Sequence, residues 1–230
     1  MDKGKELRQA GEKEQAAAAF KTAFTHARRS DQVTAAADNL KSLGATVNIV
    51  EHMGFVTRWY LLGPFDAPGT SGFRKVFAPE AGVNLDATFA GKQGTIRWKR
   101  YETSDRMGQL NLIQAIGAVK EAVGYAYTEF ESDRAVDAQL RCGADDNLSV
   151  WLNGKRAFAR EQWLNGTRLD RFTAPIKIRP GKNRLLVKIC QGPQHINPAV
   201  PNNWSLQLRL CDATGAAIGV RCLLPPAAAR

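Results

Sequence analysis

The sequence predicts a mainly β protein, an antiparallel β-sandwich preceded by a short α-helical N-terminal segment. Three observations lead to this prediction. From Phe55 onward, short runs of aromatic and branched residues alternate with glycine, proline, asparagine and aspartate, a spacing typical of a sandwich. No helices are expected between the strands of residues 125–223, which favours antiparallel sheets over a parallel α/β fold. Residues 1–44 contain no proline and place apolar side chains at helical spacing.

Two amphipathic helices are expected within residues 1–50. In the first, over 12–26, apolar side chains recur at intervals of three and four residues and form one stripe. Ser30 and Asp31 offer an N-cap to the second helix, and Gly44 is suited to end it. Since such a pair cannot bury its apolar face alone, we expect it to pack on the sandwich or on a second chain. The side chains expected at this contact are Phe20, Phe24, Leu40 and Leu43.

The expected sandwich domain, residues 51–230, has its clearest strand at 148–152. Alternate side chains there point to the core, and Trp151 faces the opposite side. Asn153-Gly154 follows as a two-residue hairpin signal, because both positions tolerate positive φ. The same alternation recurs in later runs. The predicted core includes Leu140, Val150, Leu152, Ile178, Val187, Ile189, Leu206 and Leu208.

Composition limits the class of protein. Of 230 residues, 44% are hydrophobic and 23% are charged, the ordinary globular range. No apolar run reaches the ~18–20 residues of a membrane helix, so no membrane span is expected. The four cysteines form no CxxC pair, which excludes a zinc ribbon and a disulfide scaffold but leaves a single Cys190–Cys211 bridge open. The charged start lacks the apolar core of a signal peptide, so the chain is either cytoplasmic or cut from a longer protein.

The net charge of +10 is unevenly distributed. Residues 155–188 contain ten basic and two acidic side chains, which accounts for most of the excess. One interpretation is a basic surface for an anionic partner such as a sulfated or uronic-acid glycan, and the other is a solvated strand face. No nucleic-acid-binding motif is present, so no nucleic acid partner is expected. Lys177 and Arg179 alternate with inward isoleucines and are the cations expected to contact a glycan.

Several motifs beyond residue 50 resemble those of known β-sandwich families. They are EHMGF and WYLLGPFD within 51–66, AYTEF at 126–130, LRCGADD at 140–146, VWLNGK at 150–155 and GKNRLLVK at 181–188. Together they resemble the galactose-binding-like and protective-antigen-type sandwiches appended to glycoside hydrolases, and modules of large planctomycete proteins. The resemblance implies an antiparallel jelly-roll β-sandwich and, for a fragment of a longer protein, favours an exported or cell-envelope location. Gly11, Ala16, Phe20 and Ala23 resemble the second helix of a tetratricopeptide repeat.

Asp145 and Asp146 form the most suggestive acidic pair. In protective-antigen-type relatives, paired aspartates at this place hold calcium, so the resemblance implies Asp145 and Asp146 as metal ligands here. The alternative is a turn in which the two side chains cap backbone groups. Calcium requires six to eight oxygens, of which this pair and the nearby Asn147 and Asn153 supply only part. No other cofactor is expected.

Flat aromatic rings and polar loops are the other candidate sugar contacts. Trp163 lies in a loop-like stretch and is the ring expected to be exposed. Trp151, on the side opposite the core, faces either solvent or the N-terminal helices, and the helices are the favoured cover. His195 and Asn197 belong to a proline-rich polar loop of the kind that binds ligands on β scaffolds.

No catalytic signature is present. The sequence lacks a GxSxG elbow, an HExxH helix and a phosphate-binding glycine loop, and no carboxylate pair stands out as that of a glycosidase. We therefore expect no enzyme. The expected function is a non-catalytic binding module of a larger protein, with carbohydrate, including anionic polysaccharide, as its ligand. The alternative is a scaffold domain that contacts neighbouring protein domains.

Overall fold

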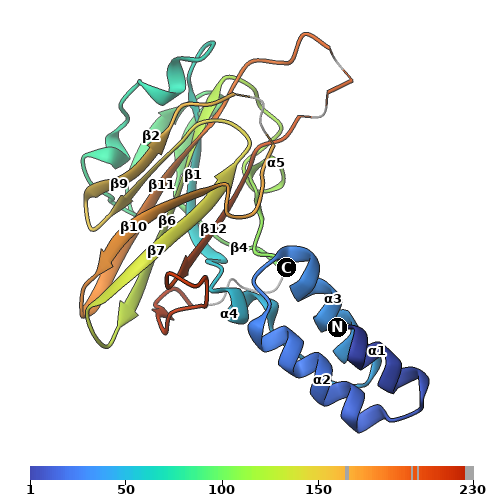
Figure 1. Cartoon of the computed structure of the whole chain (residues 1–230). Helices are drawn as coiled ribbons and strands as arrows, with labels where there is room; N and C mark the ends of the chain where they lie inside the picture. Colours follow the sequence, from blue (N-terminus) through green and yellow to red (C-terminus); the bar gives the residue numbers. More distant parts are fainter. Residues whose placement is uncertain (164–165, 198, 201, 226–230) are drawn as a thin grey trace.

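The structure is a β-sandwich with a helical extension at one end (Figure 1). This computed structural model describes residues 1–163, 166–197, 199–200 and 202–225. The helices are α1 (Asp2–Gln9), α2 (Lys13–His26), α3 (Ser30–Ser42), α4 (Ile49–Met53) and the short α5 (Leu112–Ala115), with 3-10 turns η1 (Ser71–Phe73) and η2 (Ala78–Glu80). Among the described residues, no helix has the length and apolar character needed to cross a membrane.

Two antiparallel sheets form the sandwich within the described residues. The larger sheet has the order β4-β1-β6-β11-β8-β9, and β13 also pairs with β6. The smaller has the order β10-β7-β12-β5, and β2 and β3 form a separate hairpin. The larger sheet comprises β1 (Arg58–Asp66), β4 (Lys99–Glu102), β6 (Ala122–Ser132), β8 (Leu148–Leu152), β9 (Lys155–Arg160), β11 (Gly181–Gln191) and β13 (Arg221–Cys222). The smaller comprises β5 (Leu110–Asn111), β7 (Val136–Ala144), β10 (Phe172–Ile178) and β12 (Ser205–Cys211), and the hairpin comprises β2 (Thr88–Gly91) and β3 (Gly94–Arg97).

The strand order is that of a jelly roll. From β6 the chain crosses to β7, returns to β8 and β9, crosses to β10, returns to β11 and crosses again to β12. Such alternation between two packed antiparallel sheets is the jelly-roll pattern. The predicted fold class is therefore confirmed.

The main core lies between the two sheets, where period-2 alternation predicted it. All eight predicted core residues belong to this one buried cluster, together with Trp59 and Trp204. The predicted hairpin is also present. Asn153 and Gly154 have φ values of 52° and 80° and connect β8 to its antiparallel partner β9.

The N-terminal helices bury their apolar stripes mainly against one another. Phe20, Phe24 and Leu40 lie in a second cluster that continues through Met53 of α4 to Phe55 at the edge of the sandwich. The N-cap prediction for α3 is wrong. Arg29 occupies the N-cap position without a side-chain hydrogen bond, and Ser30 already lies in the first helical turn.

A third apolar cluster covers the outer face of the larger sheet, a cover whose source no local sequence pattern indicates. Segment 67–98, between β1 and β4, packs Phe77, Val83 and Leu85 over outward-facing residues of β6 and β11. Trp151 belongs to this cluster and not to the helical one, so its predicted burial beneath the N-terminal helices is wrong. The physical reason is that a 32-residue connection lies closer to this face than the helices do.

The N-terminal extension instead meets the outer face of the smaller sheet. Arg209 of β12, which strand alternation places on the outer face of the sheet, is 1% exposed and donates to the backbone oxygens of Met53 in α4 and Gly215. Its guanidinium also forms a bidentate ion pair with Asp170.

The cysteines remain unpaired. Cys190 lies in the cluster outside the larger sheet, whereas Cys211 lies on β12 of the smaller sheet. The four thiols are free, so the bridge that the sequence left open between Cys190 and Cys211 is absent.

Candidate functional site

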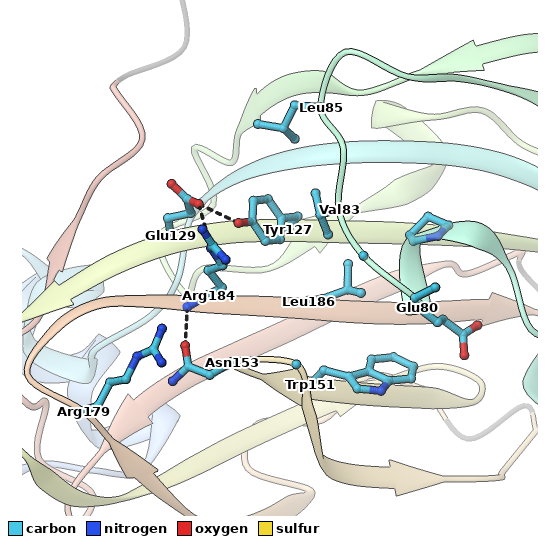
Figure 2. Close-up of a pocket in the computed structure, with 14 residues that line it drawn as sticks. Glu80, Val83, Leu85, Tyr127, Glu129, Trp151, Asn153, Arg179, Arg184 and Leu186 are labelled. Carbon is cyan, nitrogen blue, oxygen red and sulfur yellow. Dashed lines mark hydrogen bonds and ion pairs between the residues drawn. The ribbon is translucent and has the colours of Figure 1, made fainter.

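A pocket of about 480 Å³ opens on the outer face of the larger sheet. Its floor is formed by three adjacent strands, β6, β11 and β8, and one wall is formed by residues 79–85 (Figure 2). Pockets of this size suit a small ligand or one or two units of a polymer. The described residues that line it are Pro79, Glu80, Ala81, Gly82, Val83, Leu85, Tyr127, Glu129, Trp151, Asn153, Gly154, Arg179, Arg184 and Leu186.

The floor combines flat aromatic and aliphatic surface. Antiparallel register places Leu186 of β11 opposite both Tyr127 of β6 and Trp151 of β8, so the three side chains share one face. Trp151 is partly exposed, whereas Tyr127 and Leu186 are buried. The indole therefore offers a ring face to a ligand on an otherwise packed floor (Figure 2).

Glu129 provides the polar group at one end of the pocket. Its carboxylate accepts a 2.6 Å hydrogen bond from the Tyr127 hydroxyl and forms ion pairs with Lys182 at 2.6 Å and Arg184 at 3.5 Å. Burial opposes ionisation, but the hydrogen bonds from Lys182 and Tyr127 outweigh it and lower the pKa of Glu129 below its usual value. The group is thus a fixed carboxylate near neutral pH.

Two arginines line the pocket, Arg179 in the turn between β10 and β11 and Arg184 near the start of β11. Fully buried Asn183 accepts from the Arg179 amide at 3.2 Å and donates to the Arg179 carbonyl at 2.8 Å. The Asn153 side chain donates to Asn183 at 2.9 Å and accepts from the Arg184 amide at 2.9 Å. These bonds hold the β8–β9 and β10–β11 turns together, so the main-chain positions of Arg179 and Arg184 are fixed.

A buried ion pair fixes the opposite wall. Lys188 of β11 donates to Glu80 at 2.8 Å and to the backbone oxygen of Lys75 at 2.6 Å. The Tyr125 hydroxyl donates to the same Glu80 oxygen at 2.6 Å, and the Lys188 ammonium lies 5.4 Å from the Phe77 ring centroid. Although Lys188 belongs to the basic segment 155–188, it is 1% exposed and serves as an internal anchor of the pocket wall.

Of the predicted ligand contacts, the structure brings only Arg179 to this pocket. Lys177, two residues earlier, lies on β10 of the smaller sheet, where it is exposed and pairs with Asp137 at 3.5 Å. The expected shared face of Lys177 and Arg179 is therefore wrong, because β10 ends at Ile178 and the chain turns towards the other sheet.

The predicted metal ligands lie in loops at another part of the sandwich. Asp145 accepts a 2.8 Å hydrogen bond from the Gly166 amide, and Asp146 accepts one of 2.7 Å from the Gly192 amide. Both side chains thereby anchor loops. Within the described residues, no group of three or more histidine, cysteine, aspartate or glutamate side chains could hold a metal ion. The calcium interpretation stays a prediction.

Trp163, His195 and Asn197 also lie away from the pocket. Trp163 packs on Gly192, where an added Cβ would lie 2.8 Å from the indole ring, and this ring is partly buried rather than freely exposed. The Asn197 amide donates to Nδ1 of His195 at 3.0 Å, a local turn contact. The structure does not bring these three residues and the cations into one site.

Replacing Asp145 with asparagine tests the acidic pair. Burial, and then the charge of Asp146, raise the pKa of the Asp145 carboxyl. A carboxyl whose folded-state pKa exceeds its unfolded value destabilises the fold as pH rises through that folded-state pKa. Asp145→Asn should therefore raise the free energy of unfolding at pH 7 and leave it unchanged near pH 3, measured by urea denaturation. Added calcium that stabilised only the unsubstituted protein would instead support the metal interpretation.

Comparisons with known proteins leave the family open. No family model matches the chain, and no curated protein matches it. Similar solved structures include a β-galacturonidase from Eisenbergiella tayi (TM-score 0.40, 13% identity, covering 72% of this chain and 25% of that one). Others are a β-glucosidase from Kluyveromyces marxianus (0.39, 11%, 67% and 16%) and an uncultured Clostridium β-glucuronidase (0.38, 14%, 69% and 29%). The chain spans less than a third of each, and likeness at this level carries no argument about ligand or activity.

Proposed function

We propose that this protein is a non-catalytic carbohydrate-binding module of a larger protein, and that the pocket on the larger sheet is its sugar site. The supporting observation is the Trp151 ring on the pocket floor, in a pocket that the polar side chains of Glu129, Asn153 and Arg184 also line. A pyranose has an apolar C–H face that stacks on an indole and an equatorial rim of hydroxyls that exchange hydrogen bonds with such groups.

The state of the two pocket carboxylates supports a binding role rather than hydrolysis. A glycosidase uses one carboxyl group as a proton donor, which requires a raised pKa. The pKa of Glu129 is lowered, and Glu80 is occupied by Lys188 and Tyr125. Figure 2 shows the carboxylates at opposite ends of the pocket. The lowered pKa makes Glu129 unsuited to protonate a glycosidic oxygen.

A scaffold function is the second candidate. Helices α1 to α3 extend beyond the sandwich, with an apolar cluster of their own, and so present additional surface outside the two sheets (Figure 1). This arrangement favours contact with adjoining protein domains. A scaffold would bind no polysaccharide.

Removing the Trp151 ring provides the test. We expect the unsubstituted protein to be retarded in native gels containing at least one of dextran, xylan, galactomannan or alginate. Trp151→Ala should weaken that binding by about tenfold or more, since stacking contributes on the order of 1–2 kcal/mol. Trp151→Phe, which keeps a smaller ring, should retain part of the affinity.

Trp163→Ala is the matched control, because it removes an equally large ring from the loops. Melting temperatures verify that each variant is folded. No retardation by any of these polymers, or equal retardation of the Trp151→Ala variant, would reject the proposed site. Loss of binding in Trp163→Ala alone would place the ligand on the loops instead.

A further inference from the structure

The charges around the pocket are not balanced. Two cationic side chains, those of Lys182 and Arg184, form ion pairs with Glu129, and Arg179 lines the same pocket. Lys182, with the shorter 2.6 Å contact, is the closer ionic partner of Glu129, and Arg184 lies 3.5 Å away. Glu129 thus pairs with two cations, and the added charge of Arg179 leaves an excess of positive charge at this end of the pocket.

Arg179 is the clearest unsatisfied cation. Its Nε donates to the Lys182 backbone oxygen at 3.1 Å, and within the described part of the chain its guanidinium meets no carboxylate. It is exposed and lines the pocket. A guanidinium that retains free donors is suited to binding a planar carboxylate or a sulfate through paired hydrogen bonds.

The backbone beneath these cations is already ordered. The Asn183 and Asn153 side chains fix the turn that carries Arg179 and the start of β11 that carries Arg184, so little ordering of the main chain is required on binding. Preorganised donors lose less entropy on binding than donors on a mobile loop. Arg179 and Arg184 differ in this respect from other cations of the same basic segment. Lys177, for example, forms only an exposed ion pair with Asp137.

We propose that the pocket recognises an anionic sugar, with Arg179 and Arg184 binding the carboxylate or sulfate of a residue whose ring stacks on Trp151. This inference rests on the proposed function, since it assigns the ligand class of the same site. Glu129 then acts as a positioning residue that holds Arg184 and Lys182 through its fixed charge. The stacked ring supplies affinity for any pyranose, and the guanidinium pair supplies the preference for charge.

The test compares alginate, which carries carboxylates, dextran sulfate, which carries sulfates, and neutral dextran as ligands of the full chain. We expect tighter binding to at least one of the two anionic polymers than to dextran. Arg179→Gln/Arg184→Gln should weaken binding to that polymer by about tenfold or more, because hydrogen bonds between charged groups are among the strongest. Binding to dextran, where measurable, should be unchanged. The polymer to which the double variant binds more weakly, alginate or dextran sulfate, identifies the recognised anion as a carboxylate or a sulfate.

Lys13→Gln/Lys21→Gln is the matched control. It removes the same charge from exposed positions on α2, far from the pocket in the sequence and on another element, so it corrects for non-specific attraction to a basic protein. Equal losses in both double variants would overturn the inference and indicate a diffuse charge effect. Equal binding of dextran and the anionic polymers, still dependent on Trp151, would overturn the anion preference but leave the proposed function intact.

Discussion

Lys188→Met is expected to lower the free energy of unfolding by about 3–5 kcal/mol, the usual cost of breaking a buried ion pair. The substitution leaves the Glu80 carboxylate against the outer face of the larger sheet without its cation. It also leaves the carbonyl oxygen of Lys75 without its donor. Urea denaturation at pH 7 would measure the loss.

A double variant distinguishes the cost of the unpaired Glu80 charge from the cost of lost packing. Lys188→Met/Glu80→Gln removes both charges and keeps an acceptor for the Tyr125 hydroxyl, so it should recover a large part of the stability. Lys177→Met is the matched control, because its ion pair with Asp137 is exposed and should contribute less than ~1 kcal/mol. Equal losses for Lys188→Met and Lys177→Met would contradict the anchoring role of Lys188.

Arg209→Met is expected to cost about 3 kcal/mol and to loosen the helical extension. Arg209 connects β12 to Asp170 and to the backbone oxygens of Met53 and Gly215. Removing it leaves these acceptors desolvated, although Arg141 still pairs with Asp170 at 3.2 Å. Thermal unfolding would report the stability, and limited proteolysis would report faster cleavage near residue 55.

Arg106→Met is the control for this second prediction. Arg106 also connects the sandwich to the helices, through Asp38 of α3, but both partners are about half exposed. Its loss should cost no more than ~0.5–1 kcal/mol and leave the cleavage pattern unchanged. Proteolysis of the helices at the same rate in both variants would show that Arg209 does not hold α4 on the sheet.

The candidate site was only partly predictable from the sequence. Arg179 was selected from the charge pattern, and the Asn153-Gly154 turn that flanks the pocket was selected from its φ preferences. Trp151 was correctly placed on the face opposite the core, but its cover was assigned to the wrong segment. The strand that carries Tyr127 contains a further signal in the sequence. β6 has apolar residues on both faces, which indicates a strand covered on both sides.

Local chemistry alone was sufficient for the antiparallel sandwich, the core between the sheets and the hairpin turn at Asn153-Gly154, whereas the jelly-roll prediction came from the family resemblance. Period 2 in a strand and period 3.6 in a helix depend only on neighbouring residues, so Val150, Val187 and Leu208 could be assigned to the core without a partner strand. The same alternation places Arg209 and Lys188 on outer faces, and it contains no information about what covers those faces.

Only the tertiary structure decided what covers each outer face and which cations meet which acids. Segment 67–98 covers β6 and β11, and α4 meets β12, which buries Lys188 and Arg209 with partners more than 35 residues away in the chain. Pairing of β11 with both β6 and β8 brings Tyr127, Leu186 and Trp151 together, and the adjoining turn adds Arg179. Such juxtapositions follow from strand order and register, which are set by the packing of the whole chain and not by any local pattern.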